Sequence, residues 1–199
     1  MDMMTERNIA ARPLTTRRWD DLTAVFGPGG AYSGCWCMYW RVTRKEFEQN
    51  GNAGNRTSFK KIVDAGPAPG VLFYEHHTPI GWCSIGPRRH YPTLSRSPIL
   101  KPIDHRDVWS IVCFYLLPAY RSRGLFPTLI RKAVDYAADG GATAVEAYPD
   151  LRASSAAGAF MGVDEVYRRC GFVEVARRRD HRPILRYEIA PRAARGKPQ

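Results

Sequence analysis

The most constraining feature of this sequence is an apolar segment, VWSIVCFYLL at 108–117, bounded by Asp107 and Pro118. It is far shorter than the ~20 residues of a membrane helix, and it is typical of a strand buried on both faces of a sheet. PAYRSRG at 118–124 follows, and then apolar residues at helical spacing from Leu125 to Asp139. AVEAY at 144–148 is expected to form a second strand, parallel to the first through a right-handed crossover.

The elements around this unit are expected to complete a mixed sheet. The pattern predicts a strand at 10–15, a helix at 16–26 and hairpins at 71–86 and 172–189. Further helices are expected to begin at a Thr43-x-x-Glu46 capping box, near Arg56 and near Asp164. We therefore expect an α/β (α+β mixed sheet) fold in a single domain over residues 8–190. Residues 191–199 are expected to form a basic flexible tail.

Charge and cysteine content narrow the class of protein. Lys and Arg total 30 against 19 Asp and Glu, a net charge of +11, which favours an anionic partner such as nucleic acid, a membrane surface or a phosphorylated cofactor. The five cysteines are an odd number among apolar neighbours, which indicates reduced thiols. The first residues carry no secretory pattern. We expect a cytoplasmic protein without a membrane segment.

The turn before the central helix has the features of an anion site. Helix N-termini present unpaired backbone N–H groups and the positive end of the helix dipole, and pyrophosphate is a common ligand there. Gly124 lets a ligand approach the backbone closely, and Arg121 and Arg123 add positive charge. The alternative is a βα turn in which these residues occur by chance.

The order of these motifs resembles a known family. A buried strand, P-x-Y-R-x-R-G, a helix, a short strand and then Y-x-x-x-G-F, from Tyr167 to Phe172, is similar to the GNAT superfamily of acyl-CoA-dependent N-acyltransferases. The resemblance covers residues 108–189 and, more loosely, 10–86. The Walker and three-glycine dinucleotide motifs are both missing. The resemblance implies a GNAT-type fold and acetyl-CoA (coenzyme A) as cosubstrate.

The resemblance also implies a cofactor-binding set. Backbone amides of the turn would hold the pyrophosphate, and the strand edge near Phe114 and Leu116 would pair with the pantetheine arm and the acetyl carbonyl. Phe126 departs from the small residue usual in the family, and Pro127 has no N–H to give. The expected cofactor-binding residues are Phe114, Tyr115, Leu116, Arg121, Ser122, Arg123, Gly124, Leu125, Phe126 and Thr128.

Two catalytic residues are expected from the same resemblance. Tyr167 holds the position of a tyrosine that donates a proton to the leaving thiolate, and its alternative role is packing. Glu146 lies between apolar residues of the second strand, where a carboxylate is either partnered or has a raised pKa and can act as a base through water. Its alternative is an outward-facing or Arg-paired strand residue. Asp107 and Glu75 are weaker base candidates.

An unusual aromatic set suggests the acceptor site. Trp36, Tyr39, Trp82 and Trp109, with Trp40, are expected either to pack in the core or to wall a pocket for a flat or cationic acceptor. Cys35 and Cys37 with His76 and His77 lack the usual paired zinc spacing, so we expect no metal. Cys113 is expected to be a packed core thiol, without a basic partner that would make it a nucleophile.

The predicted function is transfer of an acetyl group from acetyl-CoA to a primary amine of a small molecule, directly in a ternary complex. Two alternatives keep the fold: an enzyme acting on a protein or aminoacyl-tRNA amine, and a non-catalytic acyl-CoA-binding module. A third is a basic nucleic-acid-binding protein, although no nucleic-acid motif accompanies the Arg runs. Members of the family often dimerise, so a homodimer is compatible with the resemblance.

Overall fold

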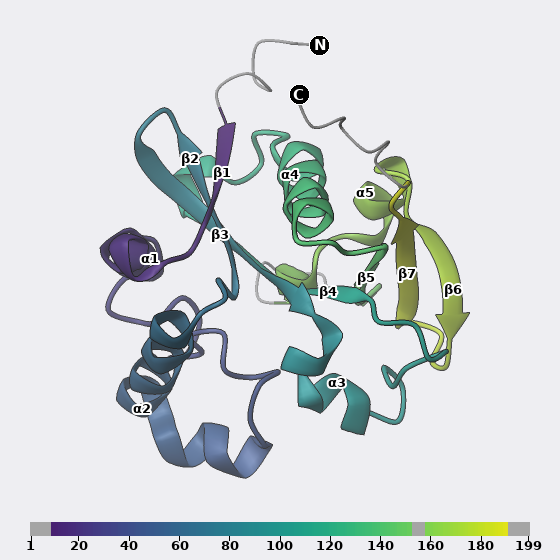
Figure 1. The fold of residues 1–199 in the computed structure, drawn as a ribbon, viewed down its shortest axis with the longest axis horizontal. Coiled ribbons are helices and arrows are strands. Elements are labelled where there is room, and N and C mark those ends of the chain that lie inside the picture. The colour runs from purple at the N-terminus through teal and green to yellow at the C-terminus, as the bar shows by residue number, and fades with distance from the viewer. Residues whose placement is uncertain (1–8, 153–157, 191–199) are drawn as a thin grey trace, which may run out of the picture.

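The computed structural model of the chain describes residues 9–152 and 158–190, and its centre is one seven-stranded sheet (Figure 1). The strand order is β1-β2-β3-β4-β5-β7-β6. The strands are β1 (Ile9–Pro13), β2 (Gly70–Glu75), β3 (Thr78–Pro87), β4 (Trp109–Leu116), β5 (Ala144–Ala147), β6 (Val173–Arg177) and β7 (Pro183–Glu188).

β4 and β5 form the one parallel pair among the described strands, and every other neighbouring pair is antiparallel. This confirms the mixed sheet and the crossover expected from the sequence. The parallel pairing joins residues 109–111 to residues 145–147 and ends there. The rest of β4 therefore has no described strand beside it on that edge, and the sheet opens at this point.

Helices cover both faces of the sheet. α4 (Phe126–Asp139) and α5 (Asp164–Arg169) pack on one face, where Leu129, Ile130 and Ala133 of α4 belong to the largest buried cluster. The other face carries α1 (Trp19–Phe26), α2 (Arg44–Ala65) and α3 (Pro92–Arg96). Figure 1 shows these two groups on opposite sides of the twisted sheet.

The N-terminal helices differ in detail from the expected ones. A short 3-10 turn at Thr16–Arg18 precedes α1, whose buried face is the predicted one of Trp19, Leu22, Val25 and Phe26. α2 consists of two helical stretches that meet at Gly51, whose φ of 54° and ψ of -163° are not helical. This confirms the two helices expected after Thr43, and the second one begins just after Gly51 rather than near Arg56. The capping box is confirmed, because Thr43 N–H donates to Glu46 Oε2 at 2.7 Å and Glu46 N–H donates to Thr43 Oγ1 at 3.2 Å.

The expected tail, residues 191–199, lies outside the described residues. Among the residues that the structure describes, no helix has both the length and the apolar character needed to cross a bilayer.

Candidate active site

The open edge of β4 is the feature around which the site is built. Against β3, Ser84 pairs with Cys113 and Ile85 with Ile111, so Val112 is an extra residue that forms a β-bulge. Further along, Leu117 donates its N–H to Ile80 at 3.0 Å. Because the bonding direction alternates along an antiparallel strand, Phe114 and Leu116 direct their N–H groups away from β3 and into the gap beyond β5.

A cavity of about 580 Å³ lies between this edge, the turn after it and α5. Its volume falls within the range of cofactor and ligand sites. Among the described residues that line it, three arginines are the charged ones and none is a carboxylate. The lining residues are Phe114, Tyr115, Leu116, Tyr120, Arg121, Ser122, Arg123, Gly124, Leu125, Phe126, Pro127, Phe160, Val163, Val166 and Arg169.

The turn at the mouth of α4 is shaped for an anion. Ser122 and Gly124 have positive φ values of 56° and 70°, which turn successive backbone N–H groups inward to form a concave nest. Within residues 9–152 and 158–190, the amides from Ser122 to Leu125 donate to no backbone carbonyl. Arg121 Nε donates to the Leu116 carbonyl at 2.9 Å, which ties the turn to the open strand edge. Unpaired amides and cations together fit a diphosphate.

All the residues expected to bind the cofactor line this cavity except Thr128, which is buried in the first turns of α4. The structure adds residues that the sequence analysis did not single out, chiefly Tyr120, Phe160 and those from α5: Val163, Val166 and Arg169. Val163, Val166 and Arg169 are spaced three residues apart just before Gly171 and Phe172. This helical spacing is the sequence signal that could have identified them as one face of a helix.

A second cavity of about 410 Å³ lies on the α1–α2 side of β4. Tyr115 and Phe160 line both cavities, so the two meet at the open strand edge. The second cavity is mainly aromatic, and Asp150 and Arg182 are the charged residues among its described lining. Its aromatic residues are Tyr32, Tyr39, Trp40, Phe47, Tyr115 and Phe160.

The structure divides the aromatic set that the sequence analysis singled out. Tyr39 and Trp40 line the second cavity, whereas Trp36, Trp82 and Trp109 do not. Trp36 stacks on Trp19 at 5.8 Å between ring centres, and Trp82 is fully buried. Trp109 packs against Tyr136 of α4 on the opposite face of the sheet. These three tryptophans pack against neighbouring side chains and do not line the second cavity, in agreement with the core-packing alternative.

The cysteines of the second cavity form a small polar cluster. Trp82 Nε1 donates to Cys37 Sγ at 3.0 Å. A hydrogen bond from Cys113, and further the Trp82 indole and the Arg41 guanidinium, lower the pKa of the Cys37 thiol against the effect of burial. Cys113 itself is half-buried and lines the second cavity, so it is not a core thiol. Among the described residues, no group of His, Cys, Asp and Glu is arranged to hold a metal ion.

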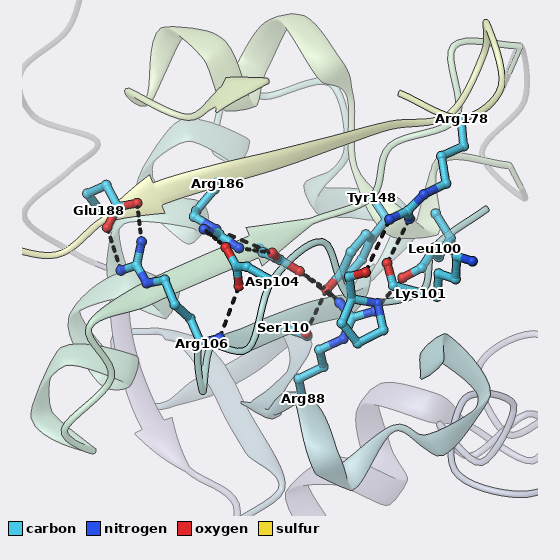
Figure 2. Close-up of polar contacts among 12 residues, drawn as sticks. Arg88, Leu100, Lys101, Asp104, Arg106, Ser110, Tyr148, Arg178, Arg186 and Glu188 are labelled. Atoms are coloured by element: carbon cyan, nitrogen blue, oxygen red, sulfur yellow. Dashed lines mark hydrogen bonds and ion pairs between the residues drawn. The ribbon is translucent and has the colours of Figure 1, made fainter. Parts of the chain in front are cut away.

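Glu146 lies outside both cavities, in a buried ionic network. Figure 2 labels its partners Arg88, Tyr148 and Arg186. Arg88 Nη1 and Arg186 Nη2 each donate to one of its carboxylate oxygens at 2.7 Å, and the Tyr148 hydroxyl donates to it at 2.8 Å. Only 1% of Glu146 is exposed. Both oxygens are engaged and neither of the two cavities reaches them, so the Arg-paired alternative describes Glu146 and its geometry does not support a base role.

The same network fastens the 87–106 connection to the sheet. Arg178 donates to the carbonyls of Lys101 at 2.7 Å and Pro102 at 3.1 Å, and Arg186 pairs with Asp104 at 2.7 Å. Figure 2 shows Arg178 beside Lys101 and Arg186 beside Asp104, with Arg106 paired to Glu188, the last residue of β7. These contacts hold the connection in place. The other base candidates lie on the surface in ion pairs, Asp107 with Arg89 and Glu75 with Arg123.

Tyr167 lies directly behind the wall of the first cavity. Its ring packs against Phe126 and Phe172, with centres 6.4 Å and 5.0 Å away, and its hydroxyl donates to the Met161 carbonyl at 3.0 Å. Gly162 must be a glycine here, because a Cβ on it would lie 2.4 Å from the Tyr167 ring. Burial raises the pKa of Tyr167 well above its usual value, so the phenol stays protonated.

Comparisons with solved structures show which known fold this is. A GNAT-family acetyltransferase from Listeria monocytogenes has a TM-score of 0.57 at 10% identity, with 91% of this chain and 95% of that chain covered. The NatC complex bound to Gag peptide and CoA has a TM-score of 0.53 at 13% identity, with 92% and 99% covered. The PaiA N-acetyltransferase of Thermoplasma acidophilum, in complex with coenzyme A, has a TM-score of 0.50 at 14% identity, with 91% and 99% covered.

No curated protein matches the chain in sequence. The family model of the GNAT acetyltransferases does match, over residues 36–172, which include the bulged strand, the anion-binding turn, α4, β5 and α5. This match spans more than half of the chain and coincides with the two cavities at the opened strand edge, so the chain belongs to the GNAT acetyltransferase family.

Proposed function

We propose that the protein transfers the acetyl group of acetyl-CoA to a primary amine of a small molecule, with the two substrates entering from opposite sides of β4. The observation that carries this proposal is the meeting of the two cavities at Tyr115 and Phe160. One cavity is lined by arginines and unpaired amides and suits the anionic acetyl-CoA. The other is aromatic and suits an organic amine. A direct transfer needs both substrates to touch at one point.

In this arrangement the turn 121–125 holds the diphosphate, and the N–H groups of Phe114 and Leu116 face the pantetheine arm and the acetyl carbonyl. Acetyl-CoA supplies a thioester that is already activated, so the chain needs no covalent nucleophile. An N–C bond forms, the C–S bond breaks and the thiolate takes up a proton. Backbone N–H groups at the strand edge stabilise the charge that develops on the carbonyl oxygen.

We assign the proton donor as Tyr167. The phenol is protonated at neutral pH, and it is hydrogen-bonded to Met161, the neighbour of Phe160 at the junction of the cavities. To donate, the hydroxyl must exchange the Met161 carbonyl for the leaving sulfur. We assign no base to Glu146, and the amine passes its proton to water in the acceptor cavity.

The test of the proposed activity is thiol release from acetyl-CoA in the presence of a panel of primary amines, peptides and aminoacyl-tRNA. Turnover with small amines supports the proposal. Turnover with peptides alone would show that the acceptor is a protein amine and not a small molecule. Peptides are the class of molecule that the NatC complex binds together with CoA. Tight CoA binding without turnover on any amine would make the protein a binding module, and retention of RNA but not CoA would contradict the whole assignment.

The placement of acetyl-CoA is tested by Gly124→Asp, which adds a negative charge to the diphosphate nest. Repulsion between unit charges about 8 Å apart at an effective dielectric of about 20 is worth about 2 kcal/mol, and is expected to weaken CoA binding by roughly 30-fold. Gly124→Asn is the matched control, because Asn and Asp tolerate the positive φ of this position equally well. Calorimetric titration with CoA measures both. Equal affinities of the two variants would show that the diphosphate lies elsewhere.

We further propose that the protein is located in the cytoplasm. A homodimer is the oligomeric state to test. The five cysteines are all free thiols, which supports a reducing compartment.

A further inference from the structure

Arg182 is an incompletely paired cation in the wall of the acceptor cavity. Its side chain is 13% exposed, and it lies in the segment between β6 and β7. Its partners among the described residues are Asp150 Oδ2, at 3.6 Å from Nη1, and the Met161 thioether sulfur, at 3.3 Å from Nη2. A thioether is a weak acceptor. A guanidinium has five N–H donors, so most of those of Arg182 have no partner among the described residues.

Asp150 does not supply what Arg182 lacks. Its Oδ1 accepts the Arg152 backbone N–H at 3.0 Å and lies 3.5 Å from Arg152 Nε. One carboxylate is thus shared between two arginines, and the contact to Arg182 is longer than a direct charge-assisted hydrogen bond. Burial lowers the pKa of Arg182, and this desolvation is offset when a second anion pairs with the guanidinium.

The other residues that line the cavity indicate which further groups its ligand carries. Tyr32, Tyr39 and Phe47 form an apolar wall suited to a flat or branched side chain. At about 410 Å³, the cavity has the size of a small-molecule site. The tyrosines 32 and 39 are 53% and 45% exposed, so a ligand would cover aromatic surface that is otherwise in water.

We propose that the acceptor is a primary amine that also carries a carboxylate and an apolar side chain, as an aromatic or branched α-amino acid does, with Arg182 binding the carboxylate. This inference rests on the proposed acetyl transfer and narrows its acceptor. The carboxylate gives Arg182 a second anion beside Asp150, the aromatic wall takes the side chain, and the amine is left for the junction at Tyr115. The reaction is the one written above, with the α-amine forming the new N–C bond.

The experiment compares three acceptors that differ at one group: phenylalanine, its primary amide and phenethylamine. Wild-type enzyme is expected to show a KM for phenylalanine about 10- to 100-fold below the KM values of the other two, because each of them lacks the charged partner of Arg182. Arg182→Gln should raise the KM for phenylalanine by the same factor and leave that for phenethylamine unchanged. Arg182→Lys should recover part of the loss, since it keeps the charge. Arg89→Gln, at an exposed arginine that does not line the cavity, is the control for net charge.

A binding measurement that needs no turnover separates this inference from the proposed function. 3-Phenylpropionate should bind the wild type and 3-phenylpropanamide should not, and Arg182→Gln should abolish the difference. Acetylation of amines with no preference for the carboxylate, or an equal loss for phenylalanine and phenethylamine in Arg182→Gln, would overturn the inference and leave the proposed function intact. Absence of acetylation on every amine would overturn the proposed function itself.

Discussion

Tyr167→Phe is expected to lower kcat for acetyl transfer by about 10²- to 10⁴-fold, the usual contribution of a positioned general acid. The variant removes one oxygen and keeps the ring that packs against Phe126 and Phe172. The affinity for CoA should therefore stay within a few-fold of the wild type. Steady-state kinetics with a saturating amine, together with CoA titration, measure both quantities. The loss should be smaller with an acyl donor whose leaving thiol has a low pKa, because such a thiolate needs less protonation.

Tyr136→Phe is the matched control for this prediction. The Tyr136 hydroxyl also donates to a backbone carbonyl, that of Ala68 at 2.9 Å, and Tyr136 lines neither cavity. Both variants lose one tyrosine-to-backbone hydrogen bond, so their stabilities should fall by similar amounts. If kcat falls equally little in both, Tyr167 has a packing role and the proton donor must be sought elsewhere.

Glu146→Gln is expected to destabilise the protein by about 3–5 kcal/mol, the usual effect of removing one partner from a buried ion pair. Arg88 and Arg186 are 6% and 5% exposed, and they would be left as two buried cations beside a neutral amide. Arg186 keeps Asp104, but Arg88 loses its carboxylate partner. Denaturant unfolding at neutral pH measures the change.

Glu188→Gln provides the comparison, because it breaks an ion pair that is largely exposed to solvent, with Arg106. Its effect on the unfolding midpoint should be far smaller. Below the melting temperature of Glu146→Gln, the folded variant should keep a kcat within a few-fold of the wild type, because Glu146 touches neither cavity. A large loss of kcat in the folded variant, with a pH profile that loses its acidic limb, would restore the base role.

The central unit of the fold could be predicted from the sequence because its signals are local. The apolar segment 108–117, the glycines that follow the helix and the short strand 144–148 each identify an element, and right-handedness fixes how they connect. The two helices after Thr43 could also be predicted, because the capping box marks the start of the first. Their boundary at Gly51 was harder to place, because a single glycine inside a helical pattern does not always end a helix.

The parts of the candidate site that consist of consecutive backbone groups could be predicted from the sequence. The parts that depend on pairing between residues far apart in the sequence could not. The turn 121–126 could be singled out because its arginines, its glycine and the helix N-terminus are consecutive in sequence, and it lines the first cavity. The surroundings of Glu146 could not be predicted from the sequence, because its partners Arg88 and Arg186 come from a distant connection and a distant strand. For the same reason the aromatic residues could not be sorted into wall and core: strand faces become known only when the bulge at Val112 and the register of β4 are known.

The arginines that fasten residues 97–106 act across long stretches of chain. Arg88 precedes Glu146 by 58 residues, Lys101 precedes Arg178 by 77 and Asp104 precedes Arg186 by 82. A ribosome delivers the chain from its N-terminus, so Arg88 can pair with Glu146 once β5 has emerged, whereas Lys101 and Asp104 gain their arginine partners only when β6 and β7 follow. A nascent chain stalled before β6 would therefore display residues 101–104 of the connection, unfastened, to chaperones and proteases.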